Sequence, residues 1–209
     1  MINSIGKNFP ETTITGCFFH FGQCFYRCIQ RSGLQSWYAA PKNSRIIKSY
    51  QSLAFVPVDD VSSAFVELTT SLENDTFDTI SPFIGYFEST WIGSFSNGRR
   101  RNPMFGQSMW NMYQRTINNL PRTTNSLEGW HRAFEQRVNI THPTPARLVG
   151  KIKREQARWE LTMEQMSLGK YGNTRHKRFV KANELIREIV QNYQKESVLI
   201  YLDKLAGLI

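Results

Sequence analysis

The sequence predicts a mainly α-helical protein with one short β-strand. Apolar residues recur at steps of three and four through most of the 209 residues, and residues 146–168 and 175–206 show this period over their whole length. A run of four β-branched residues occurs near the start, at residues 12–15. The chain is long enough to bury a hydrophobic core.

The first 34 residues predict a helix, a strand and a second helix. Residues 1–9 have the pattern of a helix that ends before Pro10, because a residue preceding proline disfavours helical geometry. Residues 12–17 predict the strand. Since a lone strand cannot pair its backbone groups, we expect either that its partner strands are missing from this chain or that the segment is poorly ordered. Residues 18–32 predict a helix with an apolar face of phenylalanines, ended by Gly33.

The middle of the chain predicts several short helices. Residues 45–72 contain two apolar runs separated by Pro57, and Asp59 or Asp60 can cap the second. Ser81 and Pro82 indicate the start of a helix through Trp91. Glycines, Asn97 and Pro103 make residues 93–105 a loop, and residues 110–120 predict another helix.

The last third predicts three longer helices. Residues 121–140 begin with polar capping candidates, and a proline-rich break separates them from residues 146–168. In residues 175–206 the apolar positions form a seam of the coiled-coil type: Phe179, Ala182, Ile186, Ile189 and Tyr193. Two explanations of the seam remain open, packing on the preceding helix or contact with a partner such as a second copy.

The net charge of +9 is concentrated in one region. Residues 99–181 hold 17 Lys and Arg against 5 Asp and Glu, a balance of +12, whereas the remainder holds 9 against 12, or −3. Such a regional surplus favours a polyanionic partner such as DNA, although a generally basic surface would give the same count. The sequence shows neither a cleavable leader nor a long apolar run, so we expect a soluble intracellular protein without membrane contact.

Three segments resemble parts of one transposase family. The sequence Arg-Thr-Thr-Asn-Ser-Leu-Glu-Gly-Trp-His at residues 122–131 closely resembles the segment that carries the last catalytic acid of Mutator-like element (MULE) transposases. Residues 9–21, with Cys17 and His20, resemble the family's Cys-x-x-His segment. Residues 86–113 resemble the tract ahead of the glutamate. The three segments occur in the family's order and span most of residues 9–165.

This resemblance implies a domain organisation. The expected fold is mainly α, as the C-terminal fragment of a ribonuclease-H-like α/β core with one short strand, a helical insertion and a helical tail. Residues 1–34 would be the remnant of the core and residues 35–120 the insertion. Residues 121–140 would form the helix with the third catalytic acid, and residues 141–209 the tail.

The resemblance also implies a catalytic role for Glu128. The family cleaves and joins DNA strands in the nucleus with Mg²⁺ or Mn²⁺, held by three carboxylates. Glu128 matches the third carboxylate as catalytic acid and metal ligand, with Asn125, His131, Cys17 and His20 near the site. No residue matches the two upstream aspartates, and one glutamate is not a metal site. We therefore expect a truncated transposase that is inactive alone.

Local patterns leave other interpretations of these residues open. Glu128 also fits a solvated or capping acid paired with Arg132, four residues later. Cys17 and His20, with Cys24 and Cys28 on the next helix, suggest zinc; we do not expect it, because a second well-spaced pair is missing and buried cysteines commonly act as small apolar groups. His131 also fits a half-buried helix residue. Trp91, Trp110 and Trp130 fit core packing better than base stacking.

Basic residues in two places are candidate DNA contacts. Arg99, Arg100 and Arg101 lie in the glycine-bearing loop, and Lys151, Lys153, Arg154 and Arg158 lie on the helix at 146–168. Arg175, Lys177 and Arg178 extend the basic region. Three rivals to a catalytic fragment therefore remain: a DNA-binding module without catalysis, a helical interaction or dimerisation protein derived from a transposase, and a fragment of a longer gene.

Overall fold

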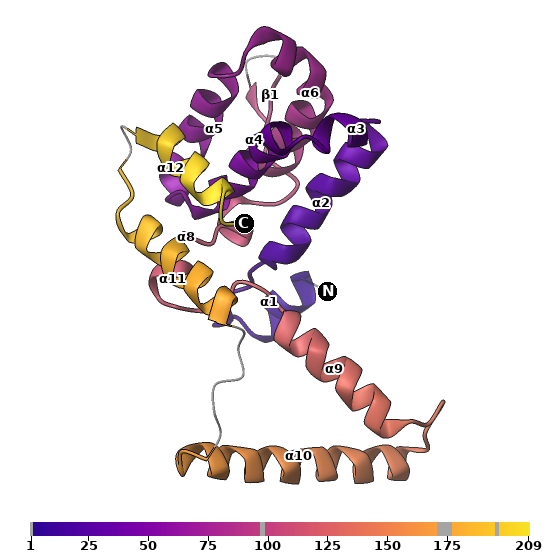
Figure 1. The fold of residues 1–209 in the computed structure, drawn as a ribbon. Helices are drawn as coiled ribbons and strands as arrows, with labels where there is room; N and C mark the ends of the chain where they lie inside the picture. The colour runs from indigo at the N-terminus through magenta and orange to yellow at the C-terminus, as the bar shows by residue number, and fades with distance from the viewer. Residues whose placement is uncertain (1, 97–98, 171–176, 195–196) are drawn as a thin grey trace. The chain divides into compact units, whose positions relative to one another are not determined.

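The protein is mainly helical, as predicted (Figure 1). A computed structural model describes residues 2–96, 99–170, 177–194 and 197–209. The chain divides into two compact units: unit 1 comprises Met1–Thr123 and Lys181–Ile209, and unit 2 comprises Thr124–Val180. Unit 2 is thus an insertion in the sequence of unit 1, which differs from the four segments that the resemblance implied.

The predicted strand at residues 12–17 does not form. These residues are irregular between α1 (Ile2–Asn8) and α2 (Phe18–Arg31), and Gly16 N–H donates to Met109 O at 2.6 Å. Next to them, Phe18 N–H donates to Arg122 O at 2.9 Å. Single hydrogen bonds of this kind are not a ladder, and β-branched residues alone do not make a strand without a partner edge. The structure therefore does not bear out the strand of a ribonuclease-H-like core.

Helix α2 forms as its apolar period predicted and buries Phe21, Phe25, Cys28 and Ile29. Gly33, at φ +68°, follows its end, because this left-handed conformation costs glycine little. After α3 (Gln35–Tyr38), α4 (Pro41–Ser52) begins with proline in its first turn, where a missing N–H is harmless. Short 3₁₀ turns η1 (Leu53–Phe55) and η2 (Val58–Asp60) lead to α5 (Val61–Thr70).

Asp60 occupies the capping position of α5 but makes no side-chain capping bond there. Its carboxylate instead accepts a hydrogen bond from the Tyr193 hydroxyl at 3.2 Å. The Asp60 carboxylate, which the local sequence predicted to cap α5, therefore binds Tyr193 instead.

Helix α6 (Asn74–Phe87) starts before the Ser81–Pro82 pair that was expected to begin it, so that prediction is wrong. Pro82 lies inside the helix and lacks the N–H that would bond Asp78 O. The Ser81 hydroxyl donates to that carbonyl at 2.9 Å instead. A side-chain donor therefore replaces the missing backbone donor, and the helix continues into a π-helical turn, η3 (Glu88–Ile92).

The expected loop at 93–105 contains a short hairpin. Strands β1 (Phe95–Ser96) and β2 (Arg99–Arg100) pair antiparallel, and Asn97 and Gly98 lie outside the described residues. Gly93 has φ +98°, and an added Cβ would lie 2.5 Å from Arg101 O. Only glycine fits here, because both the backbone angle and the space exclude a side chain.

The single helix expected at 110–120 is two, α7 (Gln107–Trp110) and α8 (Tyr113–Ile117). Asn111 has extended geometry between them. Its side chain donates to Val56 O at 2.7 Å and accepts from Tyr113 N–H at 3.0 Å. These two bonds stabilise the break, so that the chain turns where the apolar pattern alone predicted a continuous helix.

Aromatic side chains fill the core of unit 1. The Phe87 ring lies within 6.5 Å, centroid to centroid, of the rings of Phe21, Phe25, Tyr50, Phe65, Phe83 and Trp110. Trp91 and Trp110 are buried in the same cluster, as core packing predicted. Several residues of the segment 86–113, which resembles the transposase tract ahead of the glutamate, are therefore part of the hydrophobic core.

The expected helix at 175–206 is divided into α11 (Lys177–Gln191) and α12 (Val198–Ala206). Part of the predicted seam packs within unit 1: Ile186 is buried in the core, and the Tyr193 ring contacts Tyr113 and Tyr201. Phe179, at the start of the seam, is 68% exposed. Helix α12 packs on α4, where Asp203 accepts from Arg45 at 2.5 and 2.8 Å.

Unit 2 is built on two helices, α9 (Asn125–Val138) and α10 (Pro145–Ser167), which match the predicted helices closely. Asn139 ends α9 in a left-handed conformation, and Thr144 with Pro145 begins α10. No helix within the described residues combines the length and apolar character needed to cross a membrane.

Candidate nucleic-acid interface

Glu128 lies in the first turn of α9, where the sequence placed it. Its side chain is exposed, and its carboxylate accepts a hydrogen bond from the Thr124 hydroxyl at 2.9 Å. Asn125 and His131 on the same helix are exposed too, so His131 is not the half-buried residue considered above. An acid in the first turn also interacts favourably with the helix dipole. A local structural role thus accounts for the contacts of Glu128 that the structure shows.

The residues that the resemblance places near the metal are divided between the two units. Cys17 and His20 belong to unit 1, at the start of α2, whereas Asn125, Glu128 and His131 belong to unit 2. Among the residues that the structure describes, no group of three or more His, Cys, Asp or Glu side chains is placed to hold a metal ion. The described residues alone therefore do not supply the set of carboxylates that a two-metal centre requires.

A different acid, Glu155, organises unit 2. It lies in the middle of α10 and is only 7% exposed. Arg137 of α9 donates to both of its oxygens, at 2.5 and 2.9 Å, and the indole N–H groups of Trp130 and Trp159 each donate to Oε1 at 3.1 Å. The carboxylate thus joins α9 to α10 through a two-pronged arginine pair and two neutral donors.

The surroundings of Glu155 favour its ionised form. Burial alone would raise the pKa of Glu155, but the hydrogen bonds and charge of Arg137, with the bonds from Trp159 and Trp130, outweigh burial and lower that pKa. Trp130 also stacks on Phe134 of α9, with ring centroids 5.2 Å apart and planes 7° apart. Aromatic side chains therefore flank the Glu155 carboxylate and help to fix its geometry.

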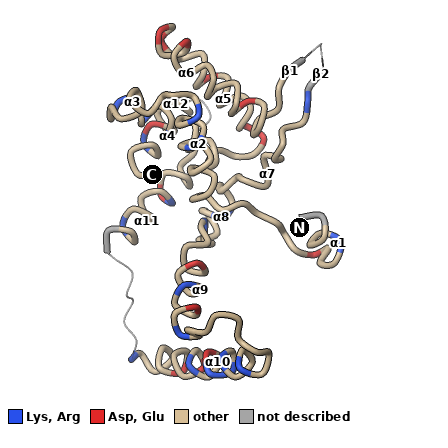
Figure 2. The backbone as a smooth tube through the Cα atoms, turned by 90° about the vertical axis from the view of Figure 1, so that its right-hand side faces the viewer, with Lys and Arg blue, Asp and Glu red and all other residues tan. Residues whose placement is uncertain are grey.

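Four basic residues form a line on α10. Arg147, Lys151, Arg154 and Arg158 follow one another at steps of four, three and four, so they share one face of the helix. We call this set the α10 stripe. Arg147, Arg154 and Arg158 are exposed, while Lys151 is half-buried and donates to Arg137 O at 2.8 Å near the end of α9. Figure 2 shows the Lys and Arg positions of α10 as blue segments of the helix.

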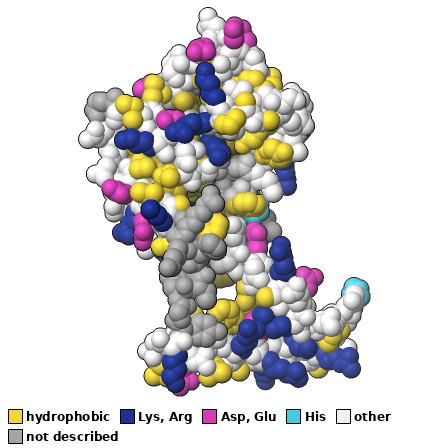
Figure 3. Space-filling view, viewed as in Figure 1, with side chains coloured by type: hydrophobic (Ala, Val, Ile, Leu, Met, Phe, Trp, Pro, Cys, Tyr) yellow, Lys and Arg dark blue, Asp and Glu magenta, His cyan; other side chains and the backbone are white. Residues whose placement is uncertain are grey.

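The α10 stripe borders a hollow between the two helices of unit 2. The hollow has a volume of about 300 Å³ and is lined by Phe134, Arg137, Val138, Lys151, Arg154, Glu155 and Arg158. Four cations thus face one buried carboxylate that is already hydrogen-bonded to Arg137. Figure 3 shows Lys and Arg side chains gathered over this part of the molecule. A cluster of this kind is suited to phosphate groups.

The other predicted DNA contacts have different positions. Lys153 is exposed but lies on a different face of α10 from the stripe. Arg101 is exposed beside β2, in unit 1. The side chains of Arg99, Arg100, Lys177 and Arg178, and all of Arg175, lie outside the described residues. Of the predicted set, the structure therefore brings together Lys151, Arg154 and Arg158.

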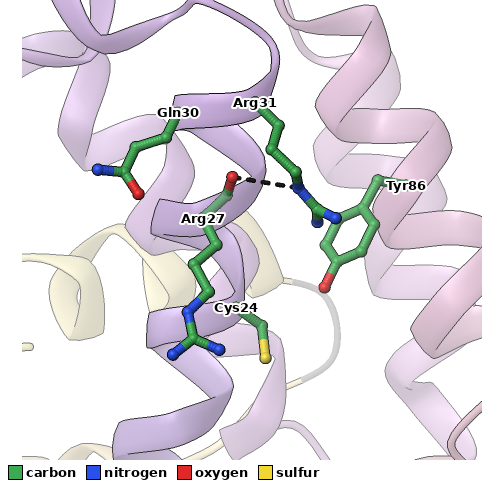
Figure 4. A pocket seen from close by; sticks show the side chains of 5 residues that line it. All are labelled: Cys24, Arg27, Gln30, Arg31 and Tyr86. Atoms are coloured by element: carbon green, nitrogen blue, oxygen red, sulfur yellow. Dashed lines mark hydrogen bonds between the residues drawn. The ribbon is translucent and has the colours of Figure 1, made fainter.

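A second hollow, of about 350 Å³, lies in unit 1 between α2 and α6 (Figure 4). Its lining consists of Cys24, Arg27, Gln30, Arg31 and Tyr86. The Arg31 guanidinium carbon lies 5.9 Å from the centre of the Tyr86 ring, and Arg31 Nε donates to Arg27 O at 3.3 Å. This contact resembles a surface cation–π pair, which holds α2 against α6.

Sequence reasoning missed Arg137 and Glu155 as organising residues. Glu155 falls on the apolar face of α10, between Ile152 and Trp159, and an acid in such a position is a signal that a cation must approach it. Arg137 gave no comparable signal, because an arginine in the last turn of a helix is common.

Comparisons with protein-family models, with curated proteins and with solved structures found no match to this chain.

Proposed function

We propose that this chain binds DNA through the phosphate backbone, with the α10 stripe as its principal contact, and that it derives from a MULE-type transposase. The observation that supports binding most directly is the alignment of Arg147, Lys151, Arg154 and Arg158 beside Arg137. The transposase origin is supported by the three sequence resemblances, and a nuclear location follows from that origin.

The dimensions and charge of unit 2 agree with this proposal. From Arg147 to Arg158 is eleven residues, or about 16 Å along the helix axis, which matches the rise of about five base pairs. Residues 124–180 hold 11 Lys and Arg against 5 Asp and Glu, a balance of +6. The contacts would be made to phosphates and would position the protein without reading base sequence.

We propose further that Glu128 is the remaining member of an ancestral set of three acids. The family's Mg²⁺ or Mn²⁺ chemistry would then require carboxylates beyond those that the described residues provide near Glu128. On this proposal the chain retains binding to DNA and does not cleave it alone. A dimer through residues 175–206 has less support, because Ile186 and Tyr193 of the seam contact unit 1.

The test compares Arg154→Glu with Lys153→Glu. The two residues are adjacent, exposed and on one helix, and each change reverses one charge, but only Arg154 lies on the α10 stripe. We expect Arg154→Glu to weaken binding to a 20-base-pair duplex about tenfold or more. The slope of log K against log salt concentration should become less steep by about one unit, as expected for the loss of one phosphate contact. Lys153→Glu should have a much smaller effect. Fluorescence anisotropy at several salt concentrations measures both.

Equal losses from the two variants would mean that binding follows overall charge rather than the stripe. No loss from Arg154→Glu, with the far-UV circular dichroism unchanged, would remove the α10 stripe as the contact.

A further inference from the structure

Trp159 is the most exposed of the five tryptophans. Its side chain is 45% exposed, whereas Trp91 and Trp110 are buried and Trp37 and Trp130 are half-buried. A large aromatic surface left in water costs free energy, so its retention on a folded surface calls for an explanation. The other exposed apolar residues on the same face are Ile152, Met163 and Met166.

The Trp159 ring is held in place without being covered. Its indole N–H donates to Glu155 Oε1 at 3.1 Å, and Glu155 is in turn fixed by two bonds from Arg137. The edge of the ring is thus anchored to the buried carboxylate of Glu155, while nearly half of the side chain stays accessible. A ligand that packs on this ring finds it already oriented, so binding loses little side-chain entropy.

Cations of the α10 stripe lie on the helix face next to the one that carries Trp159. Arg158 precedes Trp159 in the sequence, so a cation of the α10 stripe and the indole occupy adjacent faces of one helix. Arg154, one turn earlier, is exposed on the stripe as well. A phosphate on the stripe and a flat ring on Trp159 would therefore be bound side by side, and phosphate next to a flat ring is the chemistry of a nucleotide.

A base in a duplex cannot use this surface, since its faces are covered by neighbouring base pairs. An unpaired base has a free face and stacks on an aromatic side chain regardless of its identity. The arrangement of Trp159 beside the stripe therefore distinguishes between paired and unpaired nucleic acid.

We infer that Trp159 is a stacking platform for an unpaired base, and that the surface of α10 binds single-stranded DNA in preference to duplex. This inference rests on the proposed function and adds the class of substrate. The α10 stripe supplies phosphate contacts to either form, and Trp159 adds a contact that only the single strand can make.

The test compares Trp159→Leu with Trp159→Phe in the full chain. Both variants lose the indole N–H and its bond to Glu155, so they share any structural loss, and only Phe keeps an aromatic face. Affinity is measured by fluorescence anisotropy for an unstructured 20-nucleotide single strand and for the matching duplex. We expect Leu to weaken single-strand binding about 5- to 100-fold, Phe to retain most of it, and neither to change duplex binding more than twofold.

Met163→Ala is the matched control, because Met163 is exposed on the same face and lacks an aromatic ring. It should leave the ratio of single-strand to duplex affinity unchanged. Equal affinities of the Leu and Phe variants for the single strand would overturn the inference. Arg154→Glu separates the two proposals. If Arg154→Glu weakens binding to both the single strand and the duplex, while Trp159→Leu leaves the ratio of the two affinities unchanged, the phosphate contact is supported and base stacking is contradicted. If Arg154→Glu weakens neither, the proposed function itself falls.

Discussion

Glu155 is the residue on which the order of unit 2 depends most. A carboxylate on the apolar face of a helix is costly to bury, and here Arg137, Trp130 and Trp159 offset that cost with four hydrogen bonds. Removing Glu155 would leave Arg137 without its partner and the two indoles without their acceptor. One side chain therefore fixes the ion pair, the aromatic ring and one wall of the basic hollow.

The lowered pKa of Glu155 predicts instability of unit 2 in acid. A carboxyl whose folded pKa lies below its ordinary value of 4.5 stabilises the fold above that value, and the contribution is lost as pH falls through the folded pKa. We expect the midpoint temperature of thermal unfolding of unit 2 to decrease when the pH is lowered below 4.5. Glu155→Gln should lower that midpoint already at pH 7 and show a smaller further fall in acid. Thermal circular dichroism between pH 7 and pH 3 measures both.

Glu164→Gln, at an exposed position of the same helix, serves as the control and should retain the wild-type pH dependence. A Glu155→Gln protein as stable as wild type at pH 7 would show that the ion pair adds nothing to the fold.

The contrast between Glu128 and Glu155 shows what residue patterns can predict. Sequence resemblance singled out Glu128, and the structure places it on the predicted helix with a local hydrogen bond, while the described residues contribute no metal-binding group of acids there. Glu155 acquires its role from Arg137, eighteen residues earlier, and from the angle at which α9 meets α10. Such contacts depend on how the two helices pack, and the spacing of apolar residues along each helix does not predict them.

Helices with a continuous apolar period were predicted well, although α2 buries its apolar face whereas many apolar side chains of α10 are exposed. Helices α2, α9 and α10 are of this kind. The errors occur where a side chain supplies a backbone hydrogen bond. Ser81 allows α6 to pass through Pro82, and Asn111 breaks the chain between α7 and α8. The expected strand at residues 12–17 failed for the opposite reason, since no partner strand supplies its bonds.

The position of Phe87 in the aromatic core of unit 1 predicts that Phe87→Ala strongly destabilises the fold. This residue lies at the end of α6 and is fully buried among the rings that join α2, α4 and α5. Phe87→Ala should lower the free energy of unfolding by about 3–5 kcal/mol, through lost burial and the cavity left behind. Urea denaturation followed by circular dichroism gives the value.

Phe77 provides the comparison, because it lies on the same helix and is 40% exposed. Phe77→Ala should cost about 1 kcal/mol or less, as expected for a residue that loses little burial. Similar losses for the two changes would contradict the assignment of Phe87 to the centre of the core.

In the whole molecule, unit 1 holds the aromatic core and unit 2 holds most of the surplus charge. Unit 2 contributes +6 of the net +9, and unit 1 has 15 Lys and Arg against 12 Asp and Glu, or +3. The sequence indicated this regional charge, but the four expected segments did not anticipate that residues 181–209 return to unit 1. That return depends on long-range contacts such as Arg45 with Asp203, which local patterns do not contain.

The proposed division of function predicts DNA binding without cleavage by the whole chain. The purified protein with Mg²⁺ or Mn²⁺ should bind supercoiled plasmid and leave it intact, because the described acids do not surround Glu128 as a metal site requires. Agarose electrophoresis after incubation detects nicking. Metal-dependent nicking that disappears in Glu128→Gln would disprove this prediction and assign Glu128 a catalytic role in this chain.

The packing of α12 on α4 has a consequence for biosynthesis. Arg45 and Asp203 are 158 residues apart, so the ribosome adds all of unit 2 before the core of unit 1 can close. At about 5–20 residues per second, the nascent chain exposes its phenylalanine-rich helices for roughly ten to thirty seconds. During that interval the incomplete core is exposed to chaperones.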